Sequence, residues 1–313
     1  MQDNPAQELN GSVVTVDFVR HRNAMLVRAD LGPLFTDFYL HVADNKLRYT
    51  PEQAALFKTA LAAFTLHCAS RPLNEHIAWT LNFQEPRLNL FLAGDNEDCT
   101  VTGRLFTENV REAAENVFFS DIVPRRGVEP RRSVVNFQGG DVFAAVGVYY
   151  ARSEQQPVRF FDLGNDSYAM LVAQPDCDLA WFASVDAEGV RHPGAAETVG
   201  HIQSRNYGWH CGCTQQKILG AIAPAFRADP EGLFGDGETI RVECPRCAAG
   251  HTLTREAMEA YLSAVEQRLK ADWEQTRLII FGHLGDGNLH LAVSLRADSS
   301  EERQRVEEIV YSE

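Results

Sequence analysis

The sequence predicts an α+β protein: a core domain with an antiparallel sheet flanked by helices, a linker, a small C-terminal zinc module and an appended α/β fragment. Three observations lead to this fold class. Residues 77–83 and 88–92 are apolar at every second position, which is typical of strands with one buried face. Residues 51–70 carry apolar side chains at helical spacing. Four cysteines form two close pairs late in the chain, a pattern typical of a metal site.

Composition limits the classes of partner and compartment. The chain has 313 residues, of which 45% are hydrophobic, so it is long enough for two modest domains with real cores. Its net charge of −14 repels nucleic acid and anionic membranes, so we expect neither as a partner. There is no apolar run of membrane-spanning length, and residues 1–5 lack the features of a signal peptide. We therefore expect a cytoplasmic protein. In the reducing cytosol, cysteines more often bind metal or act in redox chemistry than form structural disulfides.

The elements of the core domain follow from periodicity and turn residues. Helices are expected at residues 32–42, 51–70, 107–119 and 142–150. We expect the second of these, which Pro51 opens, to be buried along one side against the sheet. Strands are expected at residues 13–20, 77–83, 88–92, 99–105, 134–137, 158–161 and 168–173. The core domain should end near residue 177.

The rest of the chain divides into three predicted segments. Residues 178–209 are a linker, interrupted by glycine and proline and weak in helix propensity. Residues 210–263 are a zinc-binding module, with a short helix around residues 218–226 and a strand at 240–242. The fragment 264–313 completes a helix begun at residue 256, whose apolar face includes Met258, Tyr261, Val265 and Leu269. Two strands follow, at 278–281 and up to 295, and then a short helix capped by Ser299.

The two cysteine pairs are Cys211 with Cys213, and Cys244 with Cys247. Four thiolates complete a tetrahedral zinc shell without another ligand. The C-x-C pair could also close into a very small, strained disulfide ring, and strained disulfides are easily reduced. The four residues therefore suit either a permanent structural zinc site or a switch between a zinc-bound reduced state and an oxidised state with two local disulfides.

Other candidate ligands and thiols lie near these pairs or elsewhere in the chain. His210 precedes Cys211 and His251 follows Cys247, so either histidine could compete as a ligand. The remaining cysteines, Cys68, Cys99 and Cys177, stand alone in apolar or isolated contexts. We expect them to be small core or surface thiols without a redox role.

Two motifs together resemble the redox-regulated 33-kDa heat-shock chaperone family. The first is the spacing C-x-C, thirty residues, C-x-x-C at residues 211–247. The second is residues 149–159, YYARSEQQPVR, which resemble the family's aromatic-x-R-S-E-Q-x-P-x-R signature. The resemblance covers about residues 15–263 and implies a structural role for the signature.

This resemblance implies a chaperone and not an enzyme. It implies one Zn²⁺ per chain, held by Cys211, Cys213, Cys244 and Cys247 when reduced. Oxidation would form Cys211–Cys213 and Cys244–Cys247 disulfides, release zinc and unfold a metastable helical linker. The expected partners are unfolded client proteins and, when oxidised, a second copy of the chain in a homodimer.

The last fifty residues resemble a different family. Residues 282–290, GHLGDGNLH, are similar to the C-terminal cap domain of flavin-linked D-2-hydroxy-acid oxidases and dehydrogenases. That resemblance would give His283 and His290 a role in holding a divalent metal or orienting a substrate. Two histidines alone are an incomplete metal site.

Three hypotheses follow. The first is a redox-controlled holdase. The second is a zinc-stabilised binding module without a switch, which the weak linker favours. The third is a flavin-dependent hydroxy-acid oxidoreductase, which rests on residues 282–290 alone.

Overall fold

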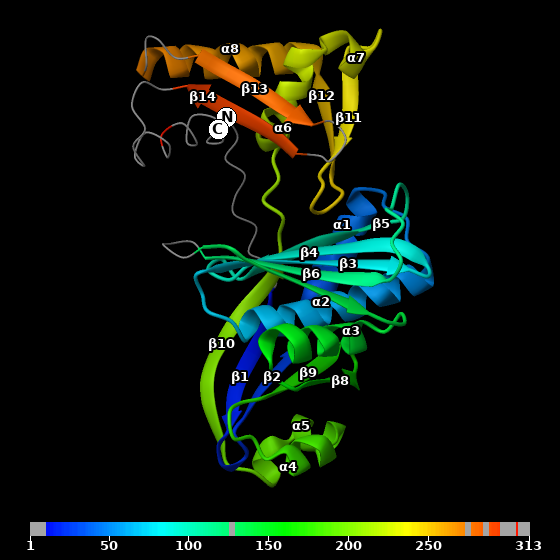
Figure 1. Cartoon of the computed structure of the whole chain (residues 1–313), viewed down its shortest axis with the longest axis vertical. Coiled ribbons are helices and arrows are strands. Elements are labelled where there is room, and N and C mark those ends of the chain that lie inside the picture. The colour runs from blue at the N-terminus through cyan, green and yellow to red at the C-terminus, as the bar shows by residue number, and fades with distance from the viewer. Residues whose placement is uncertain (1–10, 125–128, 273–276, 284–287, 295–304, 306–313) are drawn as a thin grey trace. The chain divides into compact units, whose positions relative to one another are not determined.

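The computed structural model describes residues 11–124, 129–272, 277–283, 288–294 and 305, and the chain divides into two compact units (Figure 1). Unit 1 comprises Met1–Cys211 and Pro245–Ala248. Unit 2 comprises Gly212–Cys244 and Ala249–Glu313.

Unit 1 is built on a ten-stranded sheet in the order β7-β6-β3-β4-β5-β10-β1-β2-β9-β8. Its strands are β1 (Ser12–Val19), β2 (Ala24–Asp30), β3 (Glu75–Gln84), β4 (Arg87–Asp95), β5 (Thr100–Phe106), β6 (Asn116–Pro124), β7 (Arg131–Phe137), β8 (Val158–Gly164), β9 (Ser167–Ala173) and β10 (Val199–Trp209). All neighbours are antiparallel except β10 and β5, which pair in parallel at Gly208–Thr100 and Trp209–Val101. The predicted antiparallel sheet flanked by helices is confirmed.

Three helices, α1 (Gly32–Asp44), α2 (Pro51–Ala69) and α3 (Val142–Tyr149), contribute to the main core of unit 1. Helix α2 begins with a capping box, in which the Thr50 hydroxyl accepts from the Gln53 N–H and the Gln53 side chain accepts from the Thr50 N–H. Every residue from Ala60 to Ala69 is buried. One-sided burial is therefore wrong for this half of α2, because α3 and strands from both halves of the sheet contact it.

The opposite face of part of the sheet is covered by α4 (Leu179–Ser184) and α5 (Ala187–Arg191), which lie at the lower end of unit 1 in Figure 1. Strand β9 shows how both faces are filled. Its Tyr168, Met170 and Val172 belong to the main core. Its alternate residues, Ala169, Leu171 and Ala173, belong to a second cluster with Phe182 and Val190 of these short helices. A strand buried on both faces is apolar throughout, as residues 168–173 are.

One predicted helix is absent, and one strand was not predicted. Residues 107–115 form no helix, and β6 begins at Asn116 because its Val117, Phe118 and Phe119 pair with β3 and β7. Residues 178–209, expected as a linker with weak helix propensity, also contain a strand that was not predicted. After α4 and α5 they form β10, which places Tyr207 beside β1 and Trp209 beside β5 in the main core.

The residues of the 149–159 signature make structural contacts. The Tyr149 hydroxyl donates to Glu154 at 2.7 Å, and Arg71 donates to the same carboxylate at 3.1 Å. A position beside a turn would suggest a solvated carboxylate. The Glu154 carboxylate instead accepts hydrogen bonds from two buried or half-buried side chains. Arg159 donates to the carbonyls of Phe182 and Val185 at 2.6 and 2.8 Å. It thereby satisfies the carbonyls at the end of α4, where a cation is favourable.

Unit 2 contains α6 (Gln215–Ala228), α7 (Pro230–Phe234), α8 (Arg255–Asp272) and two hairpins, β11 (Thr239–Glu243) with β12 (Gly250–Thr254) and β13 (Arg277–His283) with β14 (Asn288–Ser294). The predicted apolar face of α8 is buried at Met258, Tyr261, Val265 and Leu269. It packs within the unit against α6 and β12. The predicted helix capped by Ser299 lies outside the described residues.

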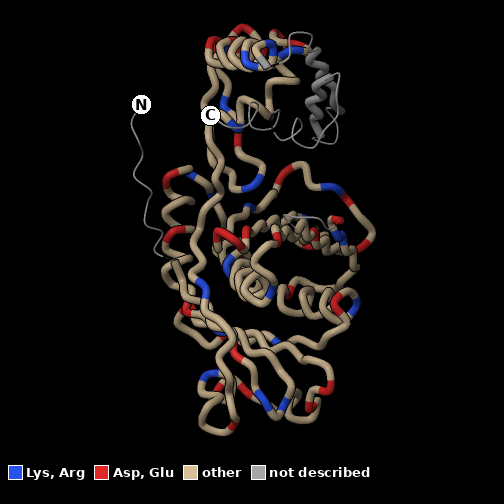
Figure 2. The backbone as a smooth tube through the Cα atoms, turned by 90° about the vertical axis from the view of Figure 1, so that its left-hand side faces the viewer, with Lys and Arg blue, Asp and Glu red and all other residues tan. Residues whose placement is uncertain are grey.

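Acidic and basic residues are interspersed along the backbone of unit 1 (Figure 2). None of the helices in the part of the chain that the structure describes has the length and hydropathy needed to cross a bilayer.

Candidate metal centre

The first cysteine pair follows directly from the end of β10. Trp209 packs against Phe38, with ring centroids 5.2 Å apart, and the His210 N–H donates to the Val101 carbonyl at 3.0 Å. The chain then turns at Gly212, whose φ of +65° lies in the left-handed region that favours glycine. The glycine of the C-x-C motif thus allows the turn between its two cysteines.

The second pair occupies the loop between β11 and β12. The hairpin ends at the pair Glu243–Gly250, and the Cys244 N–H donates to the Ala249 carbonyl at 2.8 Å. Ala248 has a φ of +63°, so the chain reverses immediately after Cys247. A hydrogen-bonded hairpin loop of this kind holds the two cysteines of a C-x-x-C motif on one short turn.

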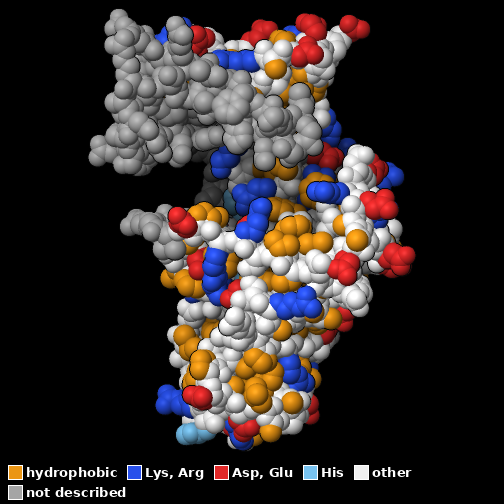
Figure 3. Space-filling view, in the orientation of Figure 1, with side chains coloured by type: hydrophobic (Ala, Val, Ile, Leu, Met, Phe, Trp, Pro, Cys, Tyr) orange, Lys and Arg blue, Asp and Glu red, His pale blue; other side chains and the backbone are white. Residues whose placement is uncertain are grey.

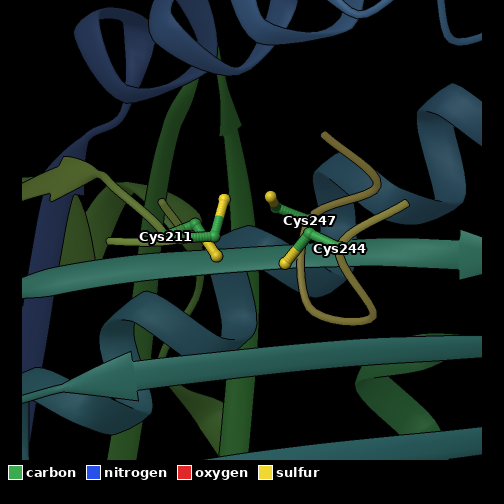
Figure 4. A group of neighbouring side chains, drawn as sticks. Cys211, Cys244 and Cys247 are labelled. Carbon is green, nitrogen blue, oxygen red and sulfur yellow. The ribbon is translucent and has the colours of Figure 1, made fainter. Parts of the chain in front are cut away.

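The four predicted ligands come together. The sulfur atoms of Cys211, Cys213, Cys244 and Cys247 all lie within 4.8 Å of one another. Figure 4 shows the labelled side chains of Cys211, Cys244 and Cys247 directed toward a common point. Cys244 and Cys247 are 2% and 1% exposed, whereas Cys211 and Cys213 are partly exposed. Sulfurs bound tetrahedrally at 2.3 Å stand about 3.8 Å apart, so this arrangement fits one Zn²⁺ after small adjustments.

A residue that the sequence analysis missed contacts the second pair. The His41 Nε2 on α1 lies 2.7 Å from the Cys247 carbonyl oxygen. Because a carbonyl only accepts, Nε2 is the donor in this bond. The other ring nitrogen, Nδ1, lies 3.3 Å from the Asn45 amide nitrogen, and the ring packs on Trp209 with centroids 5.4 Å apart. No spacing in the sequence connects a histidine at position 41 with a cysteine at 247.

The three remaining cysteines have a different environment. Cys68 is fully buried, and burial raises the pKa of its thiol well above the usual value. Burial also raises the pKa of Cys99 and of Cys177. A raised pKa lowers the thiolate fraction, which is the reactive form, so these thiols should react slowly with peroxide.

The competing histidines are not part of the four-cysteine group. Among the described residues, this group is the only cluster of potential metal ligands, and it contains neither His210 nor His251. His283 and His290 lie in β13 and β14, where the backbone pairs them with Asn288 and Phe281. Their side chains lie outside the described part of the structure, so a metal site there stays a prediction.

Comparison with solved structures tests the fold. The crystal structure of the 33 kDa chaperonin (heat shock protein 33 homolog) from Thermotoga maritima superposes on 84% of this chain and 99% of its own, with a TM-score of 0.60 and 14% sequence identity. The two proteins share a fold. The resemblance found from the cysteine spacing and the signature is confirmed at the level of this chaperonin fold. No curated protein matches the sequence significantly.

The C-terminal part of the chain matches a second family. The profile of the FAD linked oxidases, C-terminal domain, matches residues 249–313. This agrees with the resemblance found in residues 282–290. The match also begins earlier than predicted, since it includes β12 and α8, which the sequence analysis assigned partly to the zinc module.

Proposed function

We propose that this protein is a redox-controlled chaperone that acts as a holdase. Two observations support the proposal together: the chaperonin fold, and four cysteine sulfurs within 4.8 Å of one another. The proposed ligands of one Zn²⁺ per chain are Cys211, Cys213, Cys244 and Cys247. The ion would supply a cross-link between two separate loops, and such binding contributes directly to folding free energy.

The proposed switch is oxidation of each pair to a local disulfide, Cys211–Cys213 and Cys244–Cys247. Each disulfide forms when two sulfurs lose two electrons in total to one hydrogen peroxide, which is reduced to two waters. Two peroxides therefore oxidise the four thiolates, with uptake of four protons, and leave no thiolate ligand for zinc. Loss of the cross-link removes the main constraint between the two loops, so this part of the chain should unfold locally.

Unfolded clients are the proposed partners, and a second copy of the chain is the proposed partner after oxidation. Unit 1 already exposes large apolar side chains beside charged ones, as Figure 3 shows over the strands of its visible face. The most exposed in the described residues include Leu40, Val134, Leu179 and Ile202, each more than half exposed. Local unfolding would add apolar surface to these, and contiguous apolar surface is typical of protein-binding sites. The cytosol, which keeps thiols reduced, is the proposed compartment.

The test measures zinc and thiols before and after oxidant. The reduced protein should contain about one zinc per chain, and a few equivalents of peroxide should release it while four thiols are lost. The same treatment should let the protein suppress aggregation of a chemically unfolded client. Cys247→Ser should lower zinc content and abolish the response, whereas Cys68→Ser, a control at a buried thiol, should leave both unchanged. Retention of zinc under peroxide would contradict the proposed redox switch.

The alternatives make different predictions in the same experiment. A zinc-stabilised binding module without a switch would keep its zinc under oxidant and show no gain in client protection. The match of residues 249–313 favours a flavin-linked oxidoreductase instead. That function would require a purified protein with the absorbance of bound flavin near 450 nm, so a colourless preparation argues against it.

A further inference from the structure

We propose that His41 is a positioning residue for the metal centre, holding the peptide of Cys247 so that the four sulfurs stay close enough to share one ion. The inference rests on the proposed metal site and extends it to a residue outside the cysteine motifs. It predicts that zinc affinity depends on a side chain 206 positions before Cys247 in the sequence.

The hydrogen bond to Cys247 carries the argument. His41 Nε2 and the Cys247 carbonyl are 2.7 Å apart, which is a short distance for an N–H···O bond. The bond fixes the peptide plane that follows Cys247. This is also the point where the chain enters the left-handed conformation at Ala248. A rotation of that peptide would move the Cys247 sulfur away from the other three.

The His41 ring is itself fixed from two sides. The Asn45 amide, one helical turn further along α1, donates to His41 Nδ1 at 3.3 Å and to the His41 carbonyl at 3.0 Å. The ring also packs against Trp209. With Nδ1 as acceptor, the neutral ring carries its hydrogen on Nε2, the form needed to donate to Cys247.

The same aromatic cluster supports both cysteine pairs. Trp209 packs on Phe38 and on His41, and it stands two residues before Cys211. His41 stands three residues after Phe38 on α1 and contacts Cys247. One face of α1 therefore orients the chain entering the first pair and the peptide leaving the second. Groups that orient a metal ligand without touching the ion typically change metal affinity by 10–100-fold when removed.

Two substitutions separate the hydrogen bond from the packing. His41→Phe keeps an aromatic ring against Trp209 but cannot donate, so zinc affinity should fall about 10-fold and peroxide-driven zinc release should accelerate. His41→Gln retains an N–H donor of similar reach without the ring, and should retain most of the affinity. His192→Phe, at a histidine whose side chain is 63% exposed in unit 1, is the matched control and should behave as wild type.

The measurements are zinc competition against a chromogenic chelator, the rate of zinc release under peroxide, and far-UV circular dichroism to establish that each variant is folded. If His41→Phe and wild type bind zinc equally, His41 has no positioning role. If His41→Gln loses as much affinity as His41→Phe, a retained N–H donor does not preserve the site, which also overturns the inference. A wild-type protein unable to bind zinc would instead contradict the proposed function.

Discussion

At the scale of single residues, the metal centre combines four cysteine sulfurs within 4.8 Å of one another with a hydrogen bond from His41 to the Cys247 carbonyl. The spacing of the cysteines indicated one shared site, and the four sulfurs do lie together. His41 could not be found in this way, because its contact with Cys247 depends on how α1 packs in the folded unit. Local spacing indicates ligands, but the residues that position ligands come from the tertiary fold.

A buried histidine gives a prediction about acid stability. His67 is fully buried, accepts or donates one hydrogen bond with the Tyr150 hydroxyl at 2.7 Å, and lies near Arg71 and Arg131. Burial, followed by these two cations, lowers its pKa well below the usual 6.5. The unfolded chain therefore takes up a proton below pH 6.5 that the folded protein does not.

We expect protonation linked to His67 to lower the free energy of unfolding as the pH falls below 6.5, by up to about 1.4 kcal/mol per pH unit. The free energy of unfolding, measured with urea at a series of pH values from 7.5 to 5, should fall less steeply with decreasing pH for His67→Gln than for wild type. His21→Gln, at an exposed histidine of unit 1, is the control and should keep the wild-type pH dependence. An equal dependence of the free energy of unfolding on pH for wild type and His67→Gln would show that folding does not lower the pKa of His67.

At the scale of elements, period-two runs predicted strands well where one face is buried. Strands β3 and β4 have alternating buried positions, as expected. The failures have specific causes. Residues 116–124 were hidden by helix-forming residues before them, and β10 has no alternation in its first half, where exposed residues such as Ile202 stand. Only its final residues, Tyr207 and Trp209, are anchored in the core.

The hairpin of β4 and β5 depends on a glycine. A Cβ atom at Gly103 would collide with the Phe91 carbonyl oxygen and would lie 2.7 Å from the Leu92 side chain. Backbone cannot yield as a flexible side chain can, so Gly103→Ala should destabilise unit 1 by about 1–3 kcal/mol. Urea unfolding checks this against Gly140→Ala, where an added Cβ meets nothing within 4 Å. A loss of less than 0.5 kcal/mol, roughly the surface-substitution range, would mean that the hairpin shifts to admit the methyl group.

At the scale of the whole molecule, the sequence predicted the fold class but not the strand order. The order of the sheet depends on β10, a strand late in the sequence of unit 1 that lies between β5 and β1 and joins the two halves of the sheet. Such a placement carries no local sequence signal. The functional division into 1–177, 178–209, 210–263 and 264–313 stays a prediction.

The C-terminal hairpin gives a prediction for the whole chain. Among the described residues, β13 and β14 pair only with each other, and all four cysteines precede them. A protein ending at Asp272 should therefore bind as much zinc as the full chain and keep the unfolding temperature of unit 1. Zinc analysis and calorimetry of this shortened protein test the expectation. Loss of zinc on truncation would show that residues 273–313 support the metal module.

The pairing of β1 with β10 has a consequence during synthesis. Ser12, among the first residues of the sheet to leave the ribosome, pairs with Tyr207, among the last. Until β10 emerges, β1 and β5 each lack a neighbour on one side, and unpaired strand edges favour aggregation. Nascent chains of this protein should therefore depend on protection by other factors until nearly the whole of unit 1 has been translated.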